Sequence, residues 1–559
     1  MVGFCSSVCL ILKANGADHL GLFGLIRSLD MLAKERYFFI RSYELLKLRR
    51  VLCYNRFTRL KFNRVNFGGL RYNIRMSNFY ITTSIPYVND EPHVGFGMEL
   101  VEADILARYM RQFKTPVLFV TGTDEHGGKI AEKAAAAKLT PKQFTDKISQ
   151  SFQEAIKTLN ISNDRFIRTT DAGHVKRAQL IWKNLNQFIY KNLYTGWYCT
   201  GCEAFYTEQV VQANKGVCPF HNRAYEKLQE ENYFFKLSAF TPQIKEAIES
   251  DKLRIVPETR KNEIMSVINT GLEDISISRP KEKISWGIPV PGDPTQVMYV
   301  WFEALMNYIT VLGYPEHKDF KEFWPANVQV IGKDILRFHA AIWPAMLLGL
   351  GIALPEVLYV HGHIAIDNKK MSKSIGNVVS PKQIVDLYGT DAFRYFFARH
   401  IPSYEDGDFT WERLEAAYNN ELADQLGNAV SRTAAMIKNY QNGLIGDIPD
   451  AEHDIGPYRD AIENCKFDRA LDEVWEQVHG LNQYIEEAKP WEIAKSGDEE
   501  HLREVLAYLV ANLLEIAELL VPFMPATSET IHQIFGSGVL KPIKGTLFPK
   551  KETTLVKVK

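Results

Sequence analysis

The chain has little cysteine, no long apolar run and almost no net charge. Seven cysteines in 559 residues are too few and too unevenly placed for a disulfide scaffold. No stretch approaches the roughly 18 apolar residues of a membrane helix, and the best early run, at 8–12, lacks the flanks of a secretory signal. A net charge of −1 leaves any phosphate-bearing partner to local basic patches. The length predicts several globular domains, and we expect no membrane partner.

Residues 1–75 differ from the rest of the chain in charge. They hold 14 Lys and Arg against four Asp and Glu, and a strongly patterned strand begins just after Met76. Three interpretations remain open: an upstream translation with Met76 as the true start, a basic organelle-targeting extension, or an RNA-binding arm. Four acidic residues weaken the targeting interpretation. We predict a cytoplasmic protein, or an organellar one if this segment is a genuine targeting extension.

An α/β pattern begins at residue 76. Apolar strands are predicted at 79–85, 117–120, 328–331 and 357–360, and a helix with apolar residues at helical spacing is predicted from Val94. The fold class is therefore α/β, a doubly wound parallel sheet of the Rossmann type. Ligands of such sheets bind beyond the carboxyl ends of the strands. The loops at 122–127, 332–334 and 361–363 fall there and are predicted to form one site.

The remaining signals predict the domain boundaries. A cysteine-bearing segment interrupts the sheet, and after about residue 416 amphipathic helices at 416–440, 467–488 and 502–520 are typical of a helical bundle. The expected order is a first catalytic half at 76–189, an insertion at 190–245, a second half at 246–359, a loop-bearing region at 360–415 and the bundle at 416–559. Because the chain ends soon after the bundle, we expect a monomer.

Three cysteines and one histidine form two knuckles inside the insertion. Cys199-Thr-Gly-Cys202 is followed by Cys218-Pro-Phe-His221. Two pairs with two-residue gaps supply the four ligands that tetrahedral Zn²⁺ requires. Since four protein ligands leave no position for an activated water, we predict one structural Zn²⁺ per subunit, holding a segment with little core of its own. Chance spacing of the four residues is the alternative.

Two short motifs, far apart in the chain, suit a nucleotide. His93-Val-Gly95-Phe96 lies where a loop becomes a helix, so an imidazole, a glycine backbone and a helix N-terminus can meet phosphate. Residues 370–374 read Lys-Met-Ser-Lys-Ser, with two ammonium groups and two hydroxyls. Alone, the first motif is often an ordinary loop and the second a solvated basic turn. Together, in this order and on this sheet pattern, they predict activation of an amino acid by attack on the α-phosphate of ATP.

That chemistry needs positioning rather than covalent work by the protein. The amino-acid carboxylate is already a nucleophile and pyrophosphate is a competent leaving group, so stabilising charge on the pentavalent α-phosphate is the main task. We predict no general base, Mg²⁺ bound together with ATP, and catalytic roles for His93, Lys370 and Lys373.

Longer stretches accompany these two motifs. They are Pro86-Tyr-Val-Asn89, Gly122-Thr-Asp-Glu-His-Gly127, Tyr299-Val-Trp-Phe-Glu-Ala304 and Gly332-Lys-Asp-Ile-Leu-Arg-Phe-His339. With the knuckles and the lysine motif, they resemble class I aminoacyl-tRNA synthetases, and among them the methionyl-tRNA synthetase family, over about residues 76–550. The resemblance implies ATP-dependent formation of methionyl-adenylate from L-methionine. It also implies transfer of the methionyl group to the 3′ end of tRNA(Met), including initiator tRNA, for translation initiation and elongation.

The same resemblance assigns the site residues. Methionine would be bound by Ile85, Tyr87, Asp124, Trp301, Tyr308, Phe338 and His339. ATP would be bound by Asn89, His93, Gly95, Phe96, Gly332, Asp334, Lys370, Ser372 and Lys373. Asp124 would meet the substrate ammonium, Trp301 and Phe338 would enclose the thioether, and Asp334 would hold the ribose. Without the resemblance, these aromatics are ordinary core residues and His339 is a satisfied structural histidine.

The helical bundle resembles the anticodon-binding domain of the same family. Asn428, Arg432 and Trp491 match positions that read the CAU anticodon there. Unpaired RNA bases are recognised by stacking on aromatics and by hydrogen bonds to their edges, which suits this trio. As an alternative, Trp491 is a packing residue at a helix end.

Phe96 is the main departure from the family pattern, which has a second histidine at this position that contacts phosphate. Phenylalanine cannot donate a hydrogen bond, so either His93 and the lysines suffice or activity is reduced. Two other functions therefore stay open: an inactive RNA-binding relative, and a small-metabolite nucleotidyltransferase that shares the histidine motif. The second gives no reason for the insertion or the bundle. We favour the active ligase, since a decayed enzyme would not keep both lysines, Asp124 and Asp334.

Overall fold

The computed structural model describes residues 78–202, 204–206, 208–371, 376–449, 451, 453–542 and 545–551, with the backbone alone at 194, 195, 204, 205, 228 and 230. Residues 1–75, to which the three interpretations of the basic segment apply, lie outside this part, as do Ser372 and Lys373. None of the described helices has the length and apolar character needed to cross a membrane.

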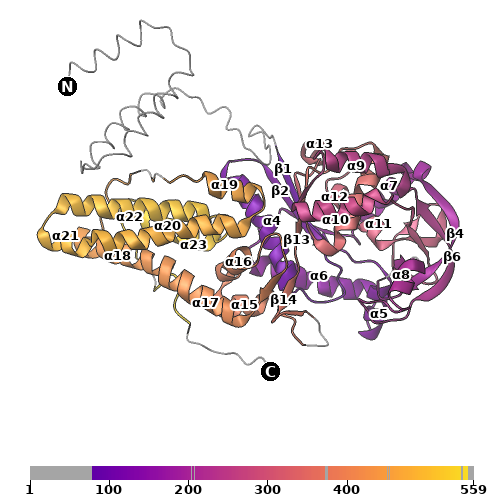
Figure 1. Ribbon diagram of the computed structural model, residues 1–559, viewed down its shortest axis with the longest axis horizontal. Coiled ribbons are helices and arrows are strands. Elements are labelled where there is room, and N and C mark those ends of the chain that lie inside the picture. Colours follow the sequence, from indigo (N-terminus) through magenta and orange to yellow (C-terminus); the bar gives the residue numbers. More distant parts are fainter. Residues whose placement is uncertain are drawn as a thin grey trace, which may run out of the picture. The chain divides into compact units, whose positions relative to one another are not determined.

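A six-stranded parallel sheet lies at the centre of the described chain (Figure 1). In spatial order it consists of β3 (Arg165–Arg168), β2 (Val117–Thr123), β1 (Phe79–Thr83), β12 (Val328–Gly332), β13 (Val357–His361) and β7 (Arg254–Val256). Each neighbouring pair is parallel. The α/β fold class and the four strands predicted from the sequence are confirmed. β3 and β7, of four and three residues, are too short for a recognisable pattern.

The strand register brings the predicted loops to one edge of the sheet. The chain order reverses between β1 and β12, where Thr83 pairs with Val330, and Gly332 pairs with His361 on β13. Such a reversal is where doubly wound sheets bind ligands. β2 continues to Thr123, so the loop predicted at 122–127 begins two residues later, at Asp124.

Helix α4 (Val94–Gln112) begins where the sequence predicts. His93 caps it, and its Nδ1 accepts a hydrogen bond from the Gly95 N–H at 3.1 Å. The helix is buried on most sides because it lies between the sheet and α16 (Thr390–Arg399). Its buried Asp104 pairs at 2.8 Å with the fully buried Arg394 of α16.

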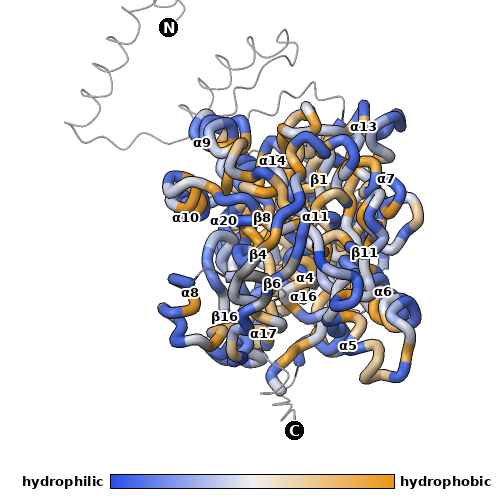
Figure 2. Tube along the Cα trace, turned by 90° about the vertical axis from the view of Figure 1, so that its right-hand side faces the viewer, coloured by the Kyte–Doolittle hydropathy of each residue, from blue (hydrophilic) through white to orange (hydrophobic). Residues whose placement is uncertain are grey.

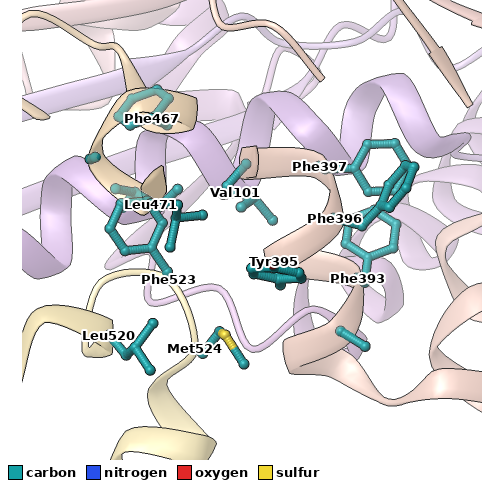
Figure 3. Packing of buried hydrophobic residues seen from close by; sticks show 14 of the residues in the cluster. Val101, Phe393, Tyr395, Phe396, Phe397, Phe467, Leu471, Leu520, Phe523 and Met524 are labelled. Carbon is teal, nitrogen blue, oxygen red and sulfur yellow. The ribbon is translucent and has the colours of Figure 1, made fainter. Parts of the chain in front are cut away.

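One apolar core joins the sheet to the C-terminal helices. Figure 3 shows aromatic side chains of α16 beside Val101 of α4, with Phe467 and Leu471 of α20 (Phe467–Ala488) nearby. Arg394 adds polar contacts, donating to the carbonyls of Pro522 and Phe523 at 2.8 and 2.7 Å. Since these contacts are buried, we expect the bundle to be held firmly on the catalytic domain.

The insertion is an antiparallel sheet. Its strands in spatial order are β5 (Ala204–Tyr206), β4 (Ile189–Cys199), β6 (Glu226–Phe235) and β8 (Ile275–Ser276), with the short helix α8 (Glu208–Ala213). The core beside the knuckles contains only Cys199, Val211, Cys218 and Tyr225 as buried members among the described residues. A metal is the expected source of stability for so small a cluster.

The C-terminal region is helical, as predicted, and α18, α20 and α22 lie side by side in Figure 1. α20 matches its predicted range, and α22 (Glu499–Leu520) starts three residues early because Asp498 caps it. The single helix predicted at 416–440 is wrong in its geometry. It consists of α17 (Trp411–Ala416), a π-helical stretch (Ala417–Gly427) and α18 (Asn428–Gln441). The wider turns displace main-chain hydrogen bonds, and the Asn482 amide donates to the Gln425 carbonyl at 3.3 Å.

Further elements complete the described chain, and Figure 2 shows hydrophilic segments such as α8 and α13 at its periphery. The helices are α5 (Gly128–Ala136), α6 (Pro141–Thr158), α7 (Ala172–Asn184), α9 (Thr241–Glu249), α10 (Glu258–Asn269), α11 (Val300–Ala304), α12 (Asn307–Thr310), α13 (Lys318–Phe323), α14 (Trp343–Leu350), α15 (Pro381–Tyr388), α19 (Gly456–Glu463), α21 (Pro490–Ser496) and α23 (Pro525–Phe535). The strands are β9 (Ser278–Pro280), β10 (Pro289–Val290), β11 (Asp293–Met298), β14 (Ile364–Ile366), β15 (Lys369–Lys370) and β16 (Gly407–Phe409).

Candidate active site

The loop after β1 is fastened to the residue that follows β2. Asp124 N–H donates to the Pro86 carbonyl at 2.9 Å, and Val88 N–H donates to the Asp124 carbonyl at 3.0 Å. Tyr87 and Asp124 thereby form an isolated parallel bridge. Asp124 is only 3% exposed. Two segments that the sequence analysis placed in the amino-acid pocket thus lie together, around a buried carboxylate suited to a cationic group.

Two aromatic pairs form the wall predicted for the thioether. Trp301 of α11 stacks on Phe338, with ring centroids 4.2 Å apart and planes 18° apart. Beside them the Tyr308 hydroxyl lies 2.7 Å from Nε2 of His339. A π-helical turn (Phe338–Ile342) carries Phe338 and His339, a geometry frequent at functional sites. Because Trp301 and Phe338 touch face to face, a thioether can pack on the pair but can lie between the rings only if they separate.

His339 is a neutral hydrogen-bonding group in this pocket. Burial lowers the pKa of His339 to about 4. Its Nδ1 lies 3.0 Å from the Ile335 carbonyl, so Nδ1–H donates there and Nε2 accepts from the Tyr308 hydroxyl. His339 therefore keeps a fixed tautomer and adds no positive charge to the pocket.

A buried carboxylate that the sequence analysis missed supports the same wall. Glu303 of α11 lies 2.8 Å from His126 and 2.9 Å from His174, and it is fully buried. Burial alone would raise the pKa of Glu303, but the two histidines outweigh burial and lower it. His126 stands at the end of the loop that contains Asp124. The charged run Asp-Glu-His after a buried strand was the available signal.

The nucleotide side of the site is more exposed. His93 lies at the start of α4, and a Cβ on Gly95 would meet the His93 ring at 3.0 Å and the Met371 methyl at 3.7 Å. Loss of hydration lowers the pKa of His93, although the ring remains open to solvent at one edge. On the next strand, a Cβ on Gly332 would meet Asp334 at 2.9 Å. Gly95 and Gly332 thus leave room for a ligand beside His93 and Asp334.

Phe96 lies next to Gly95, but its ring lies in the apolar core. Its side chain is 8% exposed and belongs to the apolar core, edge-on to Phe152 with ring centroids 4.8 Å apart. The ring packs against α6, which carries Phe152. Phe96 can offer a phosphate only its backbone. Asn89 is held by hydrogen bonds of its backbone. Its N–H donates to the Tyr87 carbonyl at 2.8 Å, and its carbonyl accepts from the Lys133 ammonium at 2.6 Å.

A buried ion pair lies beneath the nucleotide side, and the sequence analysis did not identify it. Nε2 of His361 is 3.0 Å from Glu99, which also accepts from the Ser84 hydroxyl at 2.7 Å. Burial would lower the pKa of His361, but the hydrogen bond to Glu99 and the charge of Glu102 raise it to about 9. Burial raises the pKa of Glu102 to about 7. The pair connects the end of β13 to α4 and to the end of β1.

Lys370 belongs to a small strand at the mouth of the site. In β15 it pairs with Ala365 of β14, and its carbonyl accepts from the Asn377 amide at 3.2 Å. The Lys370 side chain is exposed. Met371 extends toward Gly95, which brings the beginning of the lysine motif to the histidine motif. These two motifs are 277 positions apart in the sequence.

The four predicted metal ligands converge. The ligand atoms of Cys199, Cys202, Cys218 and His221 all lie within 4.8 Å of one another. Cys202 Sγ is 3.5 Å from Cys218 Sγ and 3.2 Å from His221 Nδ1, close to the edge of about 3.8 Å that Zn–S bonds near 2.3 Å imply for a tetrahedron. A Cβ on Gly201 would meet the His221 ring at 2.4 Å, so the first knuckle requires glycine. These residues fit a tetrahedral Zn²⁺.

The comparisons with known proteins agree with this geometry. A family model described as tRNA synthetases class I (M) matches residues 79–227 and 221–434, and one described as anticodon-binding domain of tRNA ligase matches 452–557. The chain belongs to the methionyl-tRNA synthetase family of class I enzymes. Methionine–tRNA ligases of Caldanaerobacter subterraneus subsp. tengcongensis and Thermotoga maritima are 43% and 39% identical to it, over 82% and 81% of this chain and 74% and 75% of theirs.

Solved structures of this synthetase family share the fold over most of this chain. Mycobacterium tuberculosis methionyl-tRNA synthetase in complex with methionyl-adenylate has a TM-score of 0.80 and 34% identity, covering 85% of this chain and 100% of that chain. Its apo form has a TM-score of 0.73 and 31% identity, covering 85% and 99%.

In the helical bundle, two of the three residues assigned to the anticodon lie together. Arg432 of α18 lies over the ring of Trp491 on α21, 5.8 Å from its centroid, and pairs with Glu486 at 2.6 Å. Asn428 is exposed one turn before Arg432 on the same face of α18. Trp491 is only partly buried, so one part of its ring packs and another stays open.

Proposed function

We propose that the chain activates L-methionine with ATP and transfers the methionyl group to the 3′ end of tRNA(Met), initiator tRNA included, for translation initiation and elongation. The observation that carries this proposal is the meeting, at one sheet edge, of the Asp124 pocket and the His93–Asp334 nucleotide side. These residues come from distant parts of the sequence, so their convergence at one edge supports a common function.

On the amino-acid side, Asp124 is proposed to bind the substrate ammonium, with Ile85 and Tyr87 completing that end of the pocket. Trp301 and Phe338 are proposed to contact the thioether, because a polarizable sulfur favours aromatic neighbours. Tyr308 and His339, joined by a 2.7 Å hydrogen bond, are proposed to complete the same wall. A substrate lacking the sulfur would lose this contact.

On the nucleotide side, Asp334 is proposed to hold the ribose, with Gly332 and Asn89 contributing through their backbones. His93, Gly95, Lys370, Ser372 and Lys373 are proposed to bind phosphate, and Mg²⁺ to accompany ATP. A methionine carboxylate oxygen forms a bond to the α-phosphorus while the bond to the bridging β-oxygen breaks, and pyrophosphate leaves with the electron pair. Fixed positive groups stabilise the charge that develops on the α-phosphoryl oxygens.

In the second step, a terminal ribose hydroxyl of the tRNA attacks the methionyl carbonyl and AMP leaves. Asn428, Arg432 and Trp491 are proposed to read the CAU anticodon, with the open part of Trp491 stacking on a base and Asn428 and Arg432 reaching base edges. Arg432 would exchange its pairing with Glu486 for a base.

A structural Zn²⁺ is proposed at the two knuckles, where it would hold the insertion together. Chelation of the native protein should increase hydrogen–deuterium exchange across the knuckles and α8, while α20 serves as an internal reference and stays protected. Added Zn²⁺ should reverse the change. Unchanged protection of the knuckles after verified zinc removal would contradict the structural role.

Amino-acid-dependent exchange of pyrophosphate into ATP tests the main proposal. All twenty amino acids should be compared on chains that begin at Met1 and at Met76, and methionine alone should stimulate exchange strongly. No methionine-dependent exchange from folded protein would refute an active ligase and favour the RNA-binding alternative. A single turnover that traps methionyl-adenylate would exclude that alternative.

The cysteines bear on the compartment in which the protein works. Three cysteines close together without disulfides suit a reducing compartment such as the cytoplasm. We propose a monomer, which sedimentation of the purified chain would test.

A further inference from the structure

The nucleotide side lacks a donor at the position of Phe96. The Phe96 ring lies in the core against Phe152 and has no group that can hydrogen-bond to a phosphoryl oxygen. His93 is then the one imidazole that the start of α4 supplies. Charge developing on phosphate is stabilised by donors aimed at it, so a second donor has a clear use here.

His363 stands at the same sheet edge, two residues beyond the end of β13. Its Nε2 is 3.2 Å from Oδ1 of Asp334, the carboxylate proposed to hold the ribose. The His363 side chain is 45% exposed, so it is accessible to a ligand. Its Nδ1 has no hydrogen-bond partner among the residues that the structure describes. One ring nitrogen is thus anchored and the other is open.

The backbone of His363 is fixed from both sides. Its N–H donates to Oδ1 of Asp406 at 2.9 Å, and its carbonyl accepts from the Gly407 N–H at 2.9 Å. Lys333 holds the same Asp406 carboxylate at 2.6 Å. The preceding Gly362 has no room for a side chain, because a Cβ there would lie 2.1 Å from the Glu405 carbonyl oxygen. His363 is therefore a positioned residue rather than a loose surface histidine.

The strand register places His363 on the side of His93. Gly332 pairs with His361, and Glu99 of α4 reaches His361 at 3.0 Å, so the first turns of α4 cross this edge. His93 precedes Glu99 by less than two helical turns. Besides burial, which is the larger cause, the charge of His363 lowers the pKa of His93, whereas Asp90 raises it. The two imidazoles are thus within electrostatic reach of each other.

The neighbouring His361 has no ring nitrogen available to a ligand. It is 6% exposed, with Nδ1 2.8 Å from the Gly362 carbonyl and Nε2 3.0 Å from Glu99. Both of its ring nitrogens are occupied beneath the surface. Of the two, only His363 presents a nitrogen to the ligand side.

We propose that His363 is the second imidazole of the nucleotide site, supplying the donor that Phe96 cannot. Nε2–H is held by Asp334, and Nδ1–H donates to a phosphoryl oxygen of ATP while the carboxylate attacks. Both ring nitrogens act as donors in this arrangement, one to Asp334 and the other to the ligand. The inference rests on the proposed ligase function and specifies how this chain completes its phosphate contacts.

The test measures adenylate formation in single turnovers with saturating ATP and methionine. His363→Phe should slow this step on the order of 10²-fold, the usual effect of losing one transition-state donor, with methionine affinity unchanged. His363→Gln keeps an N–H donor and should fall between wild type and His363→Phe. His501→Gln, at an exposed histidine of the bundle that is 55% exposed, is the matched control and should equal wild type.

A second variant returns the imidazole to the start of α4. Phe96→His combined with His363→Phe should recover at least part of the lost rate, provided that its thermal midpoint matches the single variant. A His363→Phe rate within threefold of wild type would overturn the inference. So would a loss confined to the KM for ATP, since His363 would then act only through Asp334. If wild type lacks methionine-dependent exchange, the ligase function itself fails; if wild type is active and His363→Phe is too, only this inference fails.

Discussion

The amino-acid side of the site is closed by packing, whereas the nucleotide side is open and charged. Asp124, Tyr308 and His339 are 3%, 1% and 2% exposed, but the Asp334 and His363 side chains are 65% and 45% exposed. The closed side presents one aromatic surface of fixed shape. The open side exposes its charged groups to solvent, which suits the proposed entry of ATP and release of pyrophosphate. Selectivity for the side chain is therefore expected to reside in packing, and rate in the charged groups.

Two buried histidines show the same contrast. His339 faces a hydroxyl and a carbonyl, and burial lowers its pKa to about 4. His361 is opposed by burial too, but Glu99 and Glu102 raise its pKa to about 9. Near neutral pH the first is neutral and the second charged. Burial alone does not set the charge of a histidine; the neighbours it meets decide the sign.

Removing the buried charge of the closed side should have the largest effect. Asp124→Asn should weaken methionine binding about 10²- to 10³-fold, because a buried ammonium would lose its counter-charge. Intrinsic fluorescence titration measures the dissociation constant. Asp386→Asn, at an exposed carboxylate of α15, is the control and should leave binding unchanged. Methionine affinity within threefold of wild type would remove Asp124 from its assigned role.

On the open side, loss of a lysine should affect rate rather than affinity. Lys373→Ala should slow adenylate formation about 10²-fold, as expected for a group that stabilises transition-state charge. Methionine affinity should hardly change. Lys382→Ala, at a lysine 72% exposed on α15, provides the control. Equal turnover in the Lys373 variant and wild type would refute the assignment. Weaker methionine binding in this variant would show that the open side also contributes to methionine affinity.

The aromatic wall should contribute less than the buried charge. Trp301→Ala should weaken methionine binding about tenfold, through loss of sulfur–aromatic contact and apolar area. Trp301→Phe keeps a ring against Phe338 and should lose less. The measurement is the affinity for methionine beside that for norleucine, which lacks the sulfur. If the affinities for methionine and norleucine fall equally, the aromatic wall contributes through its shape and not through a contact with sulfur.

The smallest effect is expected from pH. The folded-state pKa of His339, about 4, lies below the unfolded value near 6.5, so its stabilising contribution is complete above pH 6.5 and is lost as pH falls toward 4. His361, raised to about 9, contributes fully below pH 6.5 and loses that contribution as pH rises through 9. Methionine affinity should therefore vary less than twofold between pH 5.5 and 8. A steep change near pH 6.5, absent in His339→Gln, would show that His339 titrates there.

Helices and strands could be predicted from the sequence wherever apolar residues recur at regular spacing or a capping residue marks an end. The strand at β12, the start of α4 and the whole of α20 follow from periodicity and capping, which depend on nearby residues. The knuckles also follow, since two-residue gaps fix ligand geometry locally. β7 has no such signal, because three residues cannot display a period. In the π-helical stretch before α18, the Gln425 carbonyl accepts a hydrogen bond from Asn482 of another helix, a contact that no local pattern reveals.

The site was predictable only in its motifs. Asp124 and Trp301 could be assigned by resemblance, but the ion pair of Glu99 with His361 joins residues 262 positions apart and leaves no trace in either segment. Glu303 likewise acquires its two histidines through folding. Phe96 shows the reverse case. The sequence shows that residue 96 cannot donate a hydrogen bond from its side chain. Only the packing against Phe152 shows that this ring lies in the core.

The sequence by itself determined the fold class, the candidate metal ligands and the family of this chain, because alternation, spacing and motif order are properties of neighbouring residues. Only the tertiary structure decided which groups meet. It stacked Trp301 on Phe338, gave two buried histidines opposite charge, and brought His363 to Asp334. The physical reason is that hydrogen bonds and ion pairs act over a few ångströms in space, whatever the separation along the chain.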